Sequence, residues 1–184
     1  MIDIHVHIFP DEIAEATVSK LVALTGISAF SDGRLASLRS SMKENGVTKS
    51  VNQPVATRPQ QVQAINRKMA ELNAENSDVV SFGAMHPAFE GMPEELGFLA
   101  ASGFRGIKLH PDYQEFHPDD DRLLPLYETC REQGLAILFH AGKDLAYEYT
   151  HGTPRRLAQV LQIPGLRVIC AHMGRFRMWE DVEK

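Results

Sequence analysis

Histidine in this 184-residue chain is concentrated at one kind of position, the carboxyl end of a predicted β-strand. Six of the eight histidines lie at such ends: His5, His7, His86, His110, His140 and His172. One histidine there would usually have a structural role, but solvated histidines have no reason to share this position on five strands. Neutral imidazoles that converge on one point suit a divalent transition metal, most simply zinc, with manganese or iron as alternatives.

The first strand carries two of these histidines, in the segment "DIHVHIFP". His5 and His7 stand at i and i+2, so their side chains point to the same face and can share one ion. His140 is expected to close a third position and to leave an open one for water. Water bound there would serve as a nucleophile at neutral pH, and the metal would polarise a substrate oxygen. Asp3 is expected to hold the strand or a ligand in place rather than to bind metal.

The elements that must position these side chains alternate along the chain. Segments of strand character occupy residues 2–8, 48–55, 79–86, 104–110, 135–140 and 167–172. Segments of helical spacing occupy residues 11–24 with 34–45, 59–75, 92–102, 120–133 and 154–162, and a last one begins near 176. This alternation predicts parallel strands joined by crossover helices. The aliphatic residues of the first strand, including Ile2 and Ile4, are expected to pack outward under helices.

Two architectures contain parallel strands with crossover helices. A closed barrel brings many strand ends to one centre, and its carboxyl-terminal rim is where functional residues collect. An open doubly wound sheet offers only a crevice, usually opened by a glycine-rich turn, and no G-x-G-x-x-G or phosphate-loop motif follows any strand here. We therefore predict an α/β fold of the (β/α)8 TIM-barrel type, with about six of its units present in one incomplete domain over residues 1–184.

Composition sets further bounds. A hydrophobic content of 43% and a charged content of 23% are those of an ordinary globular protein. The net charge of −5 gives no reason to expect a nucleic acid or an anionic membrane as a partner. No apolar run approaches the roughly 18 residues that a membrane span needs. We expect a cytoplasmic protein with a small-molecule substrate, and a homo-oligomer is compatible with these data.

Four segments together resemble a known family. "DIHVHIFP", "GIKLHP", "FHAG" and "AHMG", in this order, are similar to motifs of the amidohydrolase superfamily. The nearest branch is the amidohydrolase-related family, which contains metal-dependent hydrolases and aminocarboxymuconate-semialdehyde-type decarboxylases. The resemblance runs from Met1 to about Arg175 and implies a distorted (β/α)8 barrel of the metallo-dependent hydrolase type. It also implies a mononuclear or binuclear metal centre at the strand ends.

Carried over by position, the resemblance implies that His5, His7 and His140 bind metal. His172 matches a histidine that either binds a second metal or orients the attacking water. Lys108 occupies a position where some superfamily members have a carbamylated lysine that bridges two metals, although a free lysine that contacts substrate is an equal alternative. His110 shares the strand face of Lys108 and is a further candidate for a catalytic role.

One expected element of the family is missing from the sequence. Relatives place an aspartate, a metal ligand or proton shuttle, at the end of the eighth strand, and Asp181 lies too early and in a helical pattern. Six units occupy these 184 residues, whereas a barrel has eight units in about 250. We expect the chain to be a fragment of a longer protein, or to be completed by a partner.

Residues near the rim of the barrel are candidates for substrate binding: Arg58, Arg175, Tyr113 and His151. A guanidinium group would recognise a carboxylate or phosphate, although a solvated loop arginine is an open alternative. The sequence predicts a metal-dependent hydrolase in which metal-bound water, oriented by His172, attacks a carbonyl-type centre. A metal-dependent decarboxylase of a small carboxylic acid is the first alternative. A catalytically incomplete, metal-binding or oligomerising barrel fragment is the alternative from another class.

Overall fold

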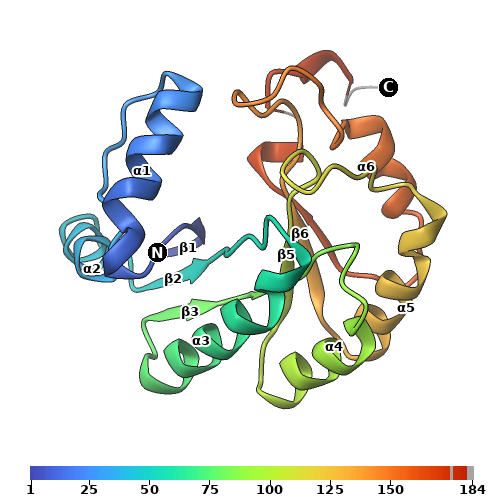
Figure 1. The fold of residues 1–184 in the computed structure, drawn as a ribbon, viewed down its shortest axis with the longest axis horizontal. Coiled ribbons are helices and arrows are strands. Elements are labelled where there is room, and N and C mark those ends of the chain that lie inside the picture. The colour runs from blue at the N-terminus through green and yellow to red at the C-terminus, as the bar shows by residue number, and fades with distance from the viewer. Residues whose placement is uncertain (175, 182–184) are drawn as a thin grey trace.

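Parallel strands form the centre of the computed structural model, which describes residues 1–174 and 176–181. The strands are β1 (Ile2–Val6), β2 (Lys49–Asn52), β3 (Val79–Ser81), β4 (Gly83–Ala84), β5 (Gly106–Leu109), β6 (Ala136–Phe139) and β7 (Val168–Cys170). They form one sheet of order β1-β2-β3 and a second of order β4-β5-β6-β7, with all pairs parallel. Strands that follow one another in space as in sequence are typical of a barrel, whereas a doubly wound sheet reverses its order. The predicted partial barrel is therefore confirmed (Figure 1).

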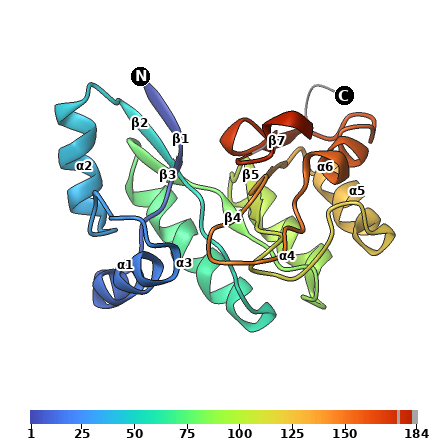
Figure 2. The same ribbon diagram turned by 90° about the horizontal axis from the view of Figure 1, so that it is seen from above.

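Helices connect the strands. They are α1 (Asp11–Thr25), α2 (Leu35–Glu44), α3 (Val62–Glu75), α4 (Met92–Ala101), α5 (Leu124–Glu132) and α6 (Pro154–Val160). Helices α1 and α2 lie at the β1–β2 end of the molecule, and α3 to α6 surround the remaining strands (Figures 1 and 2). Over residues 176–181 the helix expected from about residue 176 is reduced to a 3-10 turn, Trp179–Asp181, and the left-handed backbone of Arg177, with a φ of 57°, interrupts any helix before it. None of the helices in the described chain has the length and apolar character of a membrane span.

The main core lies between the helices and strands β4 to β7. Leu99 of α4, Ile107 of β5 and Ile137 of β6 are completely buried, and Ile107 pairs directly with Ile137 in the parallel register. Burial on both faces is expected for central parallel strands, which are covered by helices on one side and by the barrel interior on the other. This packing fixes the carboxyl ends of β5 and β6, where His110 and His140 follow.

The aliphatic side of β1 is exposed, contrary to the prediction from sequence. Ile2 is 61% exposed and Ile4 is 50% exposed. The physical reason is that β1 packs chiefly against β2, while the helices of the described residues do not pack closely on its aliphatic side. Strand β1 is also the edge strand of its sheet within residues 1–174 and 176–181. Strand β7 is the edge of the other sheet. The described residues therefore form an arc that is open between β1 and β7 (Figure 1).

The strand predicted over 79–86 is divided at Phe82, and this division separates the two sheets. Strand β3 pairs with β2, whereas β4 pairs with β5. Two asparagines of α3 replace the missing ladder bonds. Asn73 bonds the N–H and C=O of Ser81 at 2.6 and 3.1 Å, and Asn66 bonds those of Ala84 at 2.7 and 3.0 Å. The two amides stand seven residues apart, on one face of the helix.

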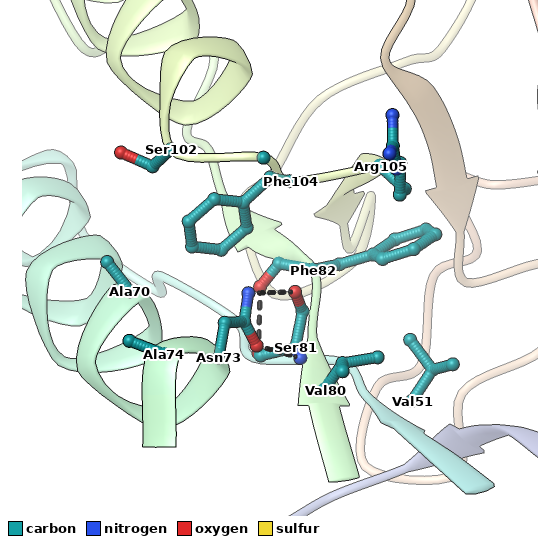
Figure 3. Close-up of a pocket in the computed structure, with 11 residues that line it drawn as sticks. Val51, Ala70, Asn73, Ala74, Val80, Ser81, Phe82, Ser102, Phe104 and Arg105 are labelled. Atoms are coloured by element: carbon teal, nitrogen blue, oxygen red, sulfur yellow. Dashed lines mark hydrogen bonds between the residues drawn. The ribbon is translucent and has the colours of Figure 1, made fainter. Parts of the chain in front are cut away.

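A cavity of about 600 Å³ lies beside this division (Figure 3). It is lined by side chains of α3 and β3 and by the segment that leads into β5, including Asn73, Phe82 and Phe104. Its lining contains none of the histidines at the strand ends. The cavity therefore belongs to the split between the sheets and not to the candidate site.

We expect Asn66→Ala to lower the free energy of unfolding by about 3 kcal/mol, because it deprives buried polar groups of their partner. Asn66 is completely buried, and besides Ala84 it donates a hydrogen bond of 2.9 Å to the buried carboxylate of Glu95. Urea denaturation of the purified variant measures the effect. Gln63→Ala, on the exposed side of the same helix, is the control and should change stability by less than about 0.5 kcal/mol. Equal effects of the two variants would contradict the structural role of Asn66.

Candidate functional site

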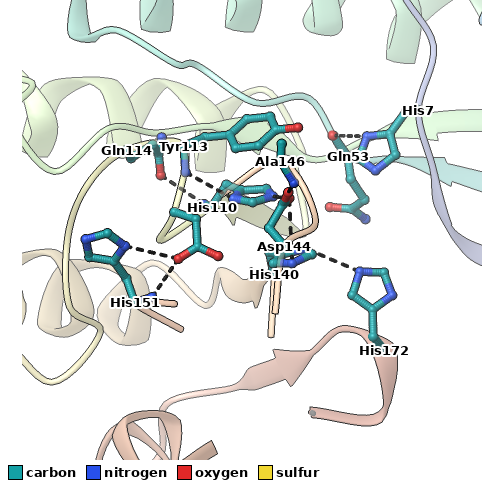
Figure 4. A network of polar contacts seen from close by, with 11 residues as sticks. His7, Gln53, His110, Tyr113, Gln114, His140, Asp144, Ala146, His151 and His172 are labelled. Atoms are coloured by element: carbon teal, nitrogen blue, oxygen red, sulfur yellow. Dashed lines mark hydrogen bonds and ion pairs between the residues drawn. The ribbon is translucent and has the colours of Figure 1, made fainter. Parts of the chain in front are cut away.

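Five histidines from the ends of four strands form a continuous row of rings, in the order His7, His5, His172, His140 and His110. Figure 4 shows four of them, His7, His172, His140 and His110. Ring centroids are 5.1 Å apart for His5 and His7, 5.1 Å for His5 and His172, 4.9 Å for His172 and His140, and 4.1 Å for His140 and His110. The contact between His5 and His172 links the end of β1 with the end of β7. Strands from both sheets thus supply side chains to one place.

His86, which the sequence also placed at a strand end, has a local role. Its Nδ1 accepts a hydrogen bond of 3.1 Å from the backbone N–H of Ala88, and the residue is 9% exposed. The ring therefore caps the turn that follows β4.

The orientation of His7 is fixed by its backbone neighbour. Its Nδ1 lies 2.9 Å from the carbonyl oxygen of Gln53. A carbonyl only accepts hydrogen bonds, so Nδ1 carries the proton and the lone pair of His7 lies on Nε2. The Gln53 side chain in turn donates to the carbonyl of Ile4 in β1. Metal-binding histidines are commonly oriented in this way, through a backbone carbonyl on the second nitrogen.

His140 lies between His172 and His110 in the row. Its Nδ1 is 3.3 Å from Nε2 of His172, and its buried Nε2 has no hydrogen-bond partner among the described residues. His172 and Met173 both adopt left-handed backbone conformations, with φ of 55° and 58°. Non-glycine residues rarely do so, and such strain is concentrated at functional sites. The turn after β7 thus carries the ring of His172 to His140.

Lys108 is the buried cation of this region. The residue is 1% exposed, and its Nζ has no hydrogen-bond partner in the part of the chain that the structure describes. Burial lowers the pKa of this ammonium group to about 7. Burial, and next to it the charge of Lys108, lowers the pKa of His5 to about 3. The imidazole of His5 is therefore neutral at pH 7, and its nitrogen lone pair is available to a metal ion.

Asp144 contributes a carboxylate that the sequence analysis did not identify. It lies in the loop after β6, and its Oδ2 is 3.3 Å from Nε2 of His110 and 3.9 Å from Nε2 of His140. The potential ligand atoms of these three residues all lie within 4.8 Å of one another. The only signal in the sequence was its position four residues after His140, in "HAGKD". Loop acids are too common for that spacing to single it out.

This donor set fits a divalent metal ion. The donors are neutral imidazoles with one carboxylate, the ligand types that zinc, manganese and iron accept. The unpaired Nε2 of His140 is a buried polar atom that a bound ion would satisfy. A buried group of this kind without a partner is uncommon in a folded protein and indicates a ligand or a functional role.

The predicted substrate-binding residues are distributed unequally. Tyr113 stacks on His110 with centroids 4.0 Å apart, directly at the site. His151 contacts Asp112, a buried residue, instead of the row of histidines. Its backbone N–H and its Nδ1 lie 2.6 and 3.1 Å from Oδ1 of Asp112. Arg58 is exposed at the start of a 3-10 turn, and the structure describes no contact between it and the five histidines. Arg175 lies outside the described residues.

A hollow of about 340 Å³ opens beside His7. Its walls are mainly apolar, with Phe9, Leu21 and Phe30 among the lining residues. Phe30 is completely exposed in the segment between α1 and α2. The long first crossover thus places apolar side chains next to one of the histidines of the row.

The chain is similar to known proteins in sequence and in fold. The family model described as amidohydrolase matches residues 2–183. A similar solved structure is that of IDCase from Metarhizium anisopliae in apo form, with a TM-score of 0.66, 18% identity and coverage of 94% of this chain and 65% of that chain. Another is 5-carboxyvanillate decarboxylase from Novosphingobium aromaticivorans complexed with manganese and 4-hydroxy-3-methoxy-5-nitrobenzoic acid, with a TM-score of 0.69, 16% identity and coverage of 94% and 65%.

A third similar structure is a probable 2-pyrone-4,6-dicarboxylic acid hydrolase from Acinetobacter baumannii with citric acid bound, with a TM-score of 0.56, 17% identity and coverage of 94% and 58%. The chain therefore spans less than two thirds of the length of these three proteins. At such identities the likeness shows the fold alone. No curated protein matches the sequence. The family model covers nearly the whole chain, and the chain belongs to the amidohydrolase family.

Proposed function

We propose that this chain forms part of a metal-dependent enzyme that acts on a small molecule, with His5, His7 and His140 as metal ligands. His172 is either a further ligand or the residue that orients the attacking water. The observation that carries the proposal is the row of histidine rings at the strand ends, together with the unpaired Nε2 of His140. Zinc is the first candidate, and manganese is supported by the similar decarboxylase complex.

A divalent ion held by these residues supplies Lewis acidity and activates water. The neighbouring residues have complementary roles. The Nζ of Lys108, with a pKa of about 7, can hold or release a proton near neutral pH or contact an anionic substrate group. His110, hydrogen-bonded to Asp144 through Nε2, is the second group placed to move a proton.

Substrate binding is proposed for four residues: Tyr113, His151, Arg58 and Arg175. Tyr113 has the strongest support, since its ring covers His110. The hollow beside His7, with its apolar walls, favours a substrate with an apolar part. The polar part of the substrate is proposed from the names of two similar structures, a 2-pyrone-4,6-dicarboxylic acid hydrolase and a 5-carboxyvanillate decarboxylase. Both names contain an acid that carries carboxylate groups on a ring. We therefore propose a small, ring-containing carboxylic acid or its ester or lactone.

Hydrolysis and decarboxylation both use such a platform, and the similar structures include proteins named for each. Hydrolysis remains our first proposal, because neutral imidazoles and a titrating lysine are suited to the activation of water. Decarboxylation is the second, and the name of the similar 5-carboxyvanillate decarboxylase favours it. The remaining alternative is a metal-binding or oligomerising barrel fragment that lacks turnover.

Metal analysis of the purified chain tests the proposal. We expect about one equivalent of zinc, manganese or iron after supplementation, and its loss in His5→Ala. The loaded protein is then assayed with esters, lactones, amides and aromatic acids, with product acid and released carbon dioxide measured separately. Metal with turnover supports the enzyme and identifies the reaction, whereas metal without turnover supports the fragment. A chain that takes up no metal at neutral pH contradicts the proposal.

A further inference from the structure

The five histidines of the row provide no negatively charged ligand for a metal ion. Their imidazoles are neutral or cationic, and Lys108 adds a group that can only be neutral or positive. A divalent cation is held more strongly where at least one ligand carries a negative charge. Among the described residues that contact the row, Asp144 provides this charge, through Oδ2 next to both His110 and His140 (Figure 4).

The carboxylate of Asp144 is held in place from two directions. Its side chain is 10% exposed, and its Oδ1 accepts a hydrogen bond of 2.7 Å from the backbone N–H of Ala146. Its Oδ2 faces the two imidazoles at 3.3 and 3.9 Å. The loop itself is anchored, because the N–H of Lys143 donates to the carbonyl of Phe176 at 2.8 Å. Asp144 thus has a defined orientation rather than that of a free loop residue.

The tautomer of His110 decides which residues of this group can bind metal. The backbone N–H of Tyr113 points to Nδ1 of His110 at 3.3 Å, so Nδ1 is the accepting nitrogen and the proton of the neutral ring lies on Nε2. That Nε2–H donates to Oδ2 of Asp144. Both nitrogens of His110 are thereby used, and the ring is a hydrogen-bond donor to the carboxylate.

His140 has the opposite arrangement. Its Nδ1 is engaged with His172, and its Nε2 is buried and unpaired at 3.9 Å from Oδ2 of Asp144. This distance is too long for a hydrogen bond. It is compatible with an ion between the two atoms, since oxygen and nitrogen ligands lie about 2.0 to 2.2 Å from zinc.

We propose that Asp144 is the carboxylate ligand of this metal site, that it shares the ion with Nε2 of His140, and that His110 is the positioning residue that orients the carboxylate. This inference rests on the proposed metal-dependent function. It assigns a ligand from the loop after β6, which the ring row alone does not predict.

Manganese(II) titration followed by electron paramagnetic resonance tests the assignment without reference to turnover. We expect Asp144→Asn to weaken Mn²⁺ binding by more than about 100-fold and His110→Gln by about 10- to 100-fold, the usual cost of losing a group that orients a ligand. Asp120→Asn is the matched control, because Asp120 is a partly exposed carboxylate bonded to Arg122, and we expect it to bind like wild type.

The visible absorption of the cobalt(II)-substituted protein provides a second readout. Loss of a carboxylate ligand changes the coordination and therefore the spectrum of Asp144→Asn, whereas the spectrum of Asp120→Asn should be unchanged. Circular dichroism shows whether each variant is folded. If Asp144→Asn does not fold, His110→Gln still tests the assignment, because it keeps the Asp144 carboxylate and removes only the group that orients it.

His140→Ala separates the possible failures. If His140→Ala loses Mn²⁺ while Asp144→Asn keeps wild-type affinity and an unchanged cobalt spectrum, the assignment of Asp144 is wrong and the metal-dependent function stands. If the wild-type chain binds neither ion, both proposals are overturned.

Discussion

At pH 7 the metal-free Lys108→Met variant should be more stable than the wild-type protein by a few kcal/mol, with an upper limit of about 5 kcal/mol at about 1.4 kcal/mol per pKa unit. Lys108 is 1% exposed, its Nζ has no partner in the described chain, and burial lowers its pKa from 10.5 to about 7. Methionine fills similar space without a charge.

We expect the metal-loaded Lys108→Met variant to lose at least about 100-fold in turnover, because the amine is proposed to move a proton or to bind substrate.

The sign of the pH dependence follows from this lowered pKa. Between pH 7 and 10.5 the unfolded chain binds more protons at Lys108 than the folded chain, so wild-type stability rises with pH across that window. The stability advantage of Lys108→Met should therefore be close to its maximum at pH 7 and should nearly disappear by pH 10.5. Denaturant unfolding at several pH values measures it.

Lys68→Met is the control, because Lys68 is exposed and paired with Glu71 on the helix surface. It should show neither the gain in stability nor the pH dependence. A Lys108→Met variant that is less stable than wild type at pH 7, or whose effect does not change with pH, would show that the amine is solvated or paired in solution.

The inward direction of Lys108 could be predicted because it depends on a local pattern. In "GIKLHP" the alternation of side chains puts Lys108 and His110 on one face and Ile107 and Leu109 on the other. The parallel strand order was likewise predictable, since strands and helices alternate along the chain and histidines recur at strand ends. Periodicity and spacing depend only on residues that are close in the sequence, so both features can be predicted without knowing any long-range contact.

Features that depend on distant contacts were not predictable. The division at Phe82 relies on two asparagines of α3, Asn66 and Asn73, which bond the strand backbone across 8 to 18 residues. The exposure of Ile2 reflects the lack of close helix packing on the aliphatic side of β1 among the described residues, which is a long-range property. Asp144 approaches His110 across 34 residues, through a loop whose path no periodicity specifies. No local pattern therefore singled out Asp144 as a neighbour of the strand-end histidines.

His140→Ala should remove the metal and reduce turnover to background. His140 connects both sides of the site, since Nδ1 contacts His172 and Nε2 faces Asp144. Loss of a direct ligand is expected to weaken zinc binding by more than the roughly 10- to 100-fold that loss of an orienting group costs. Zinc affinity is measured by competition with a chromogenic chelator, and turnover is measured with the best substrate of the panel.

His117→Ala is the control for this substitution. His117 is a partly buried histidine that contacts the rings of Tyr149 and His151, outside the row. We expect it to keep zinc affinity within about threefold of wild type. Undiminished zinc in His140→Ala would show that the ion, if any, is bound elsewhere in the chain.

The double variant His140→Ala/Asp144→Asn carries the most information, because residues that act as a unit give non-additive effects. If both side chains hold one ion, the double variant should bind zinc no more weakly than His140→Ala, since the site is already lost. If the losses add, the two residues act at separate places. Non-additive losses of zinc affinity would therefore place His140 and Asp144 in one metal centre. The control is the double variant His140→Ala/Asp120→Asn, in which the two effects should simply add.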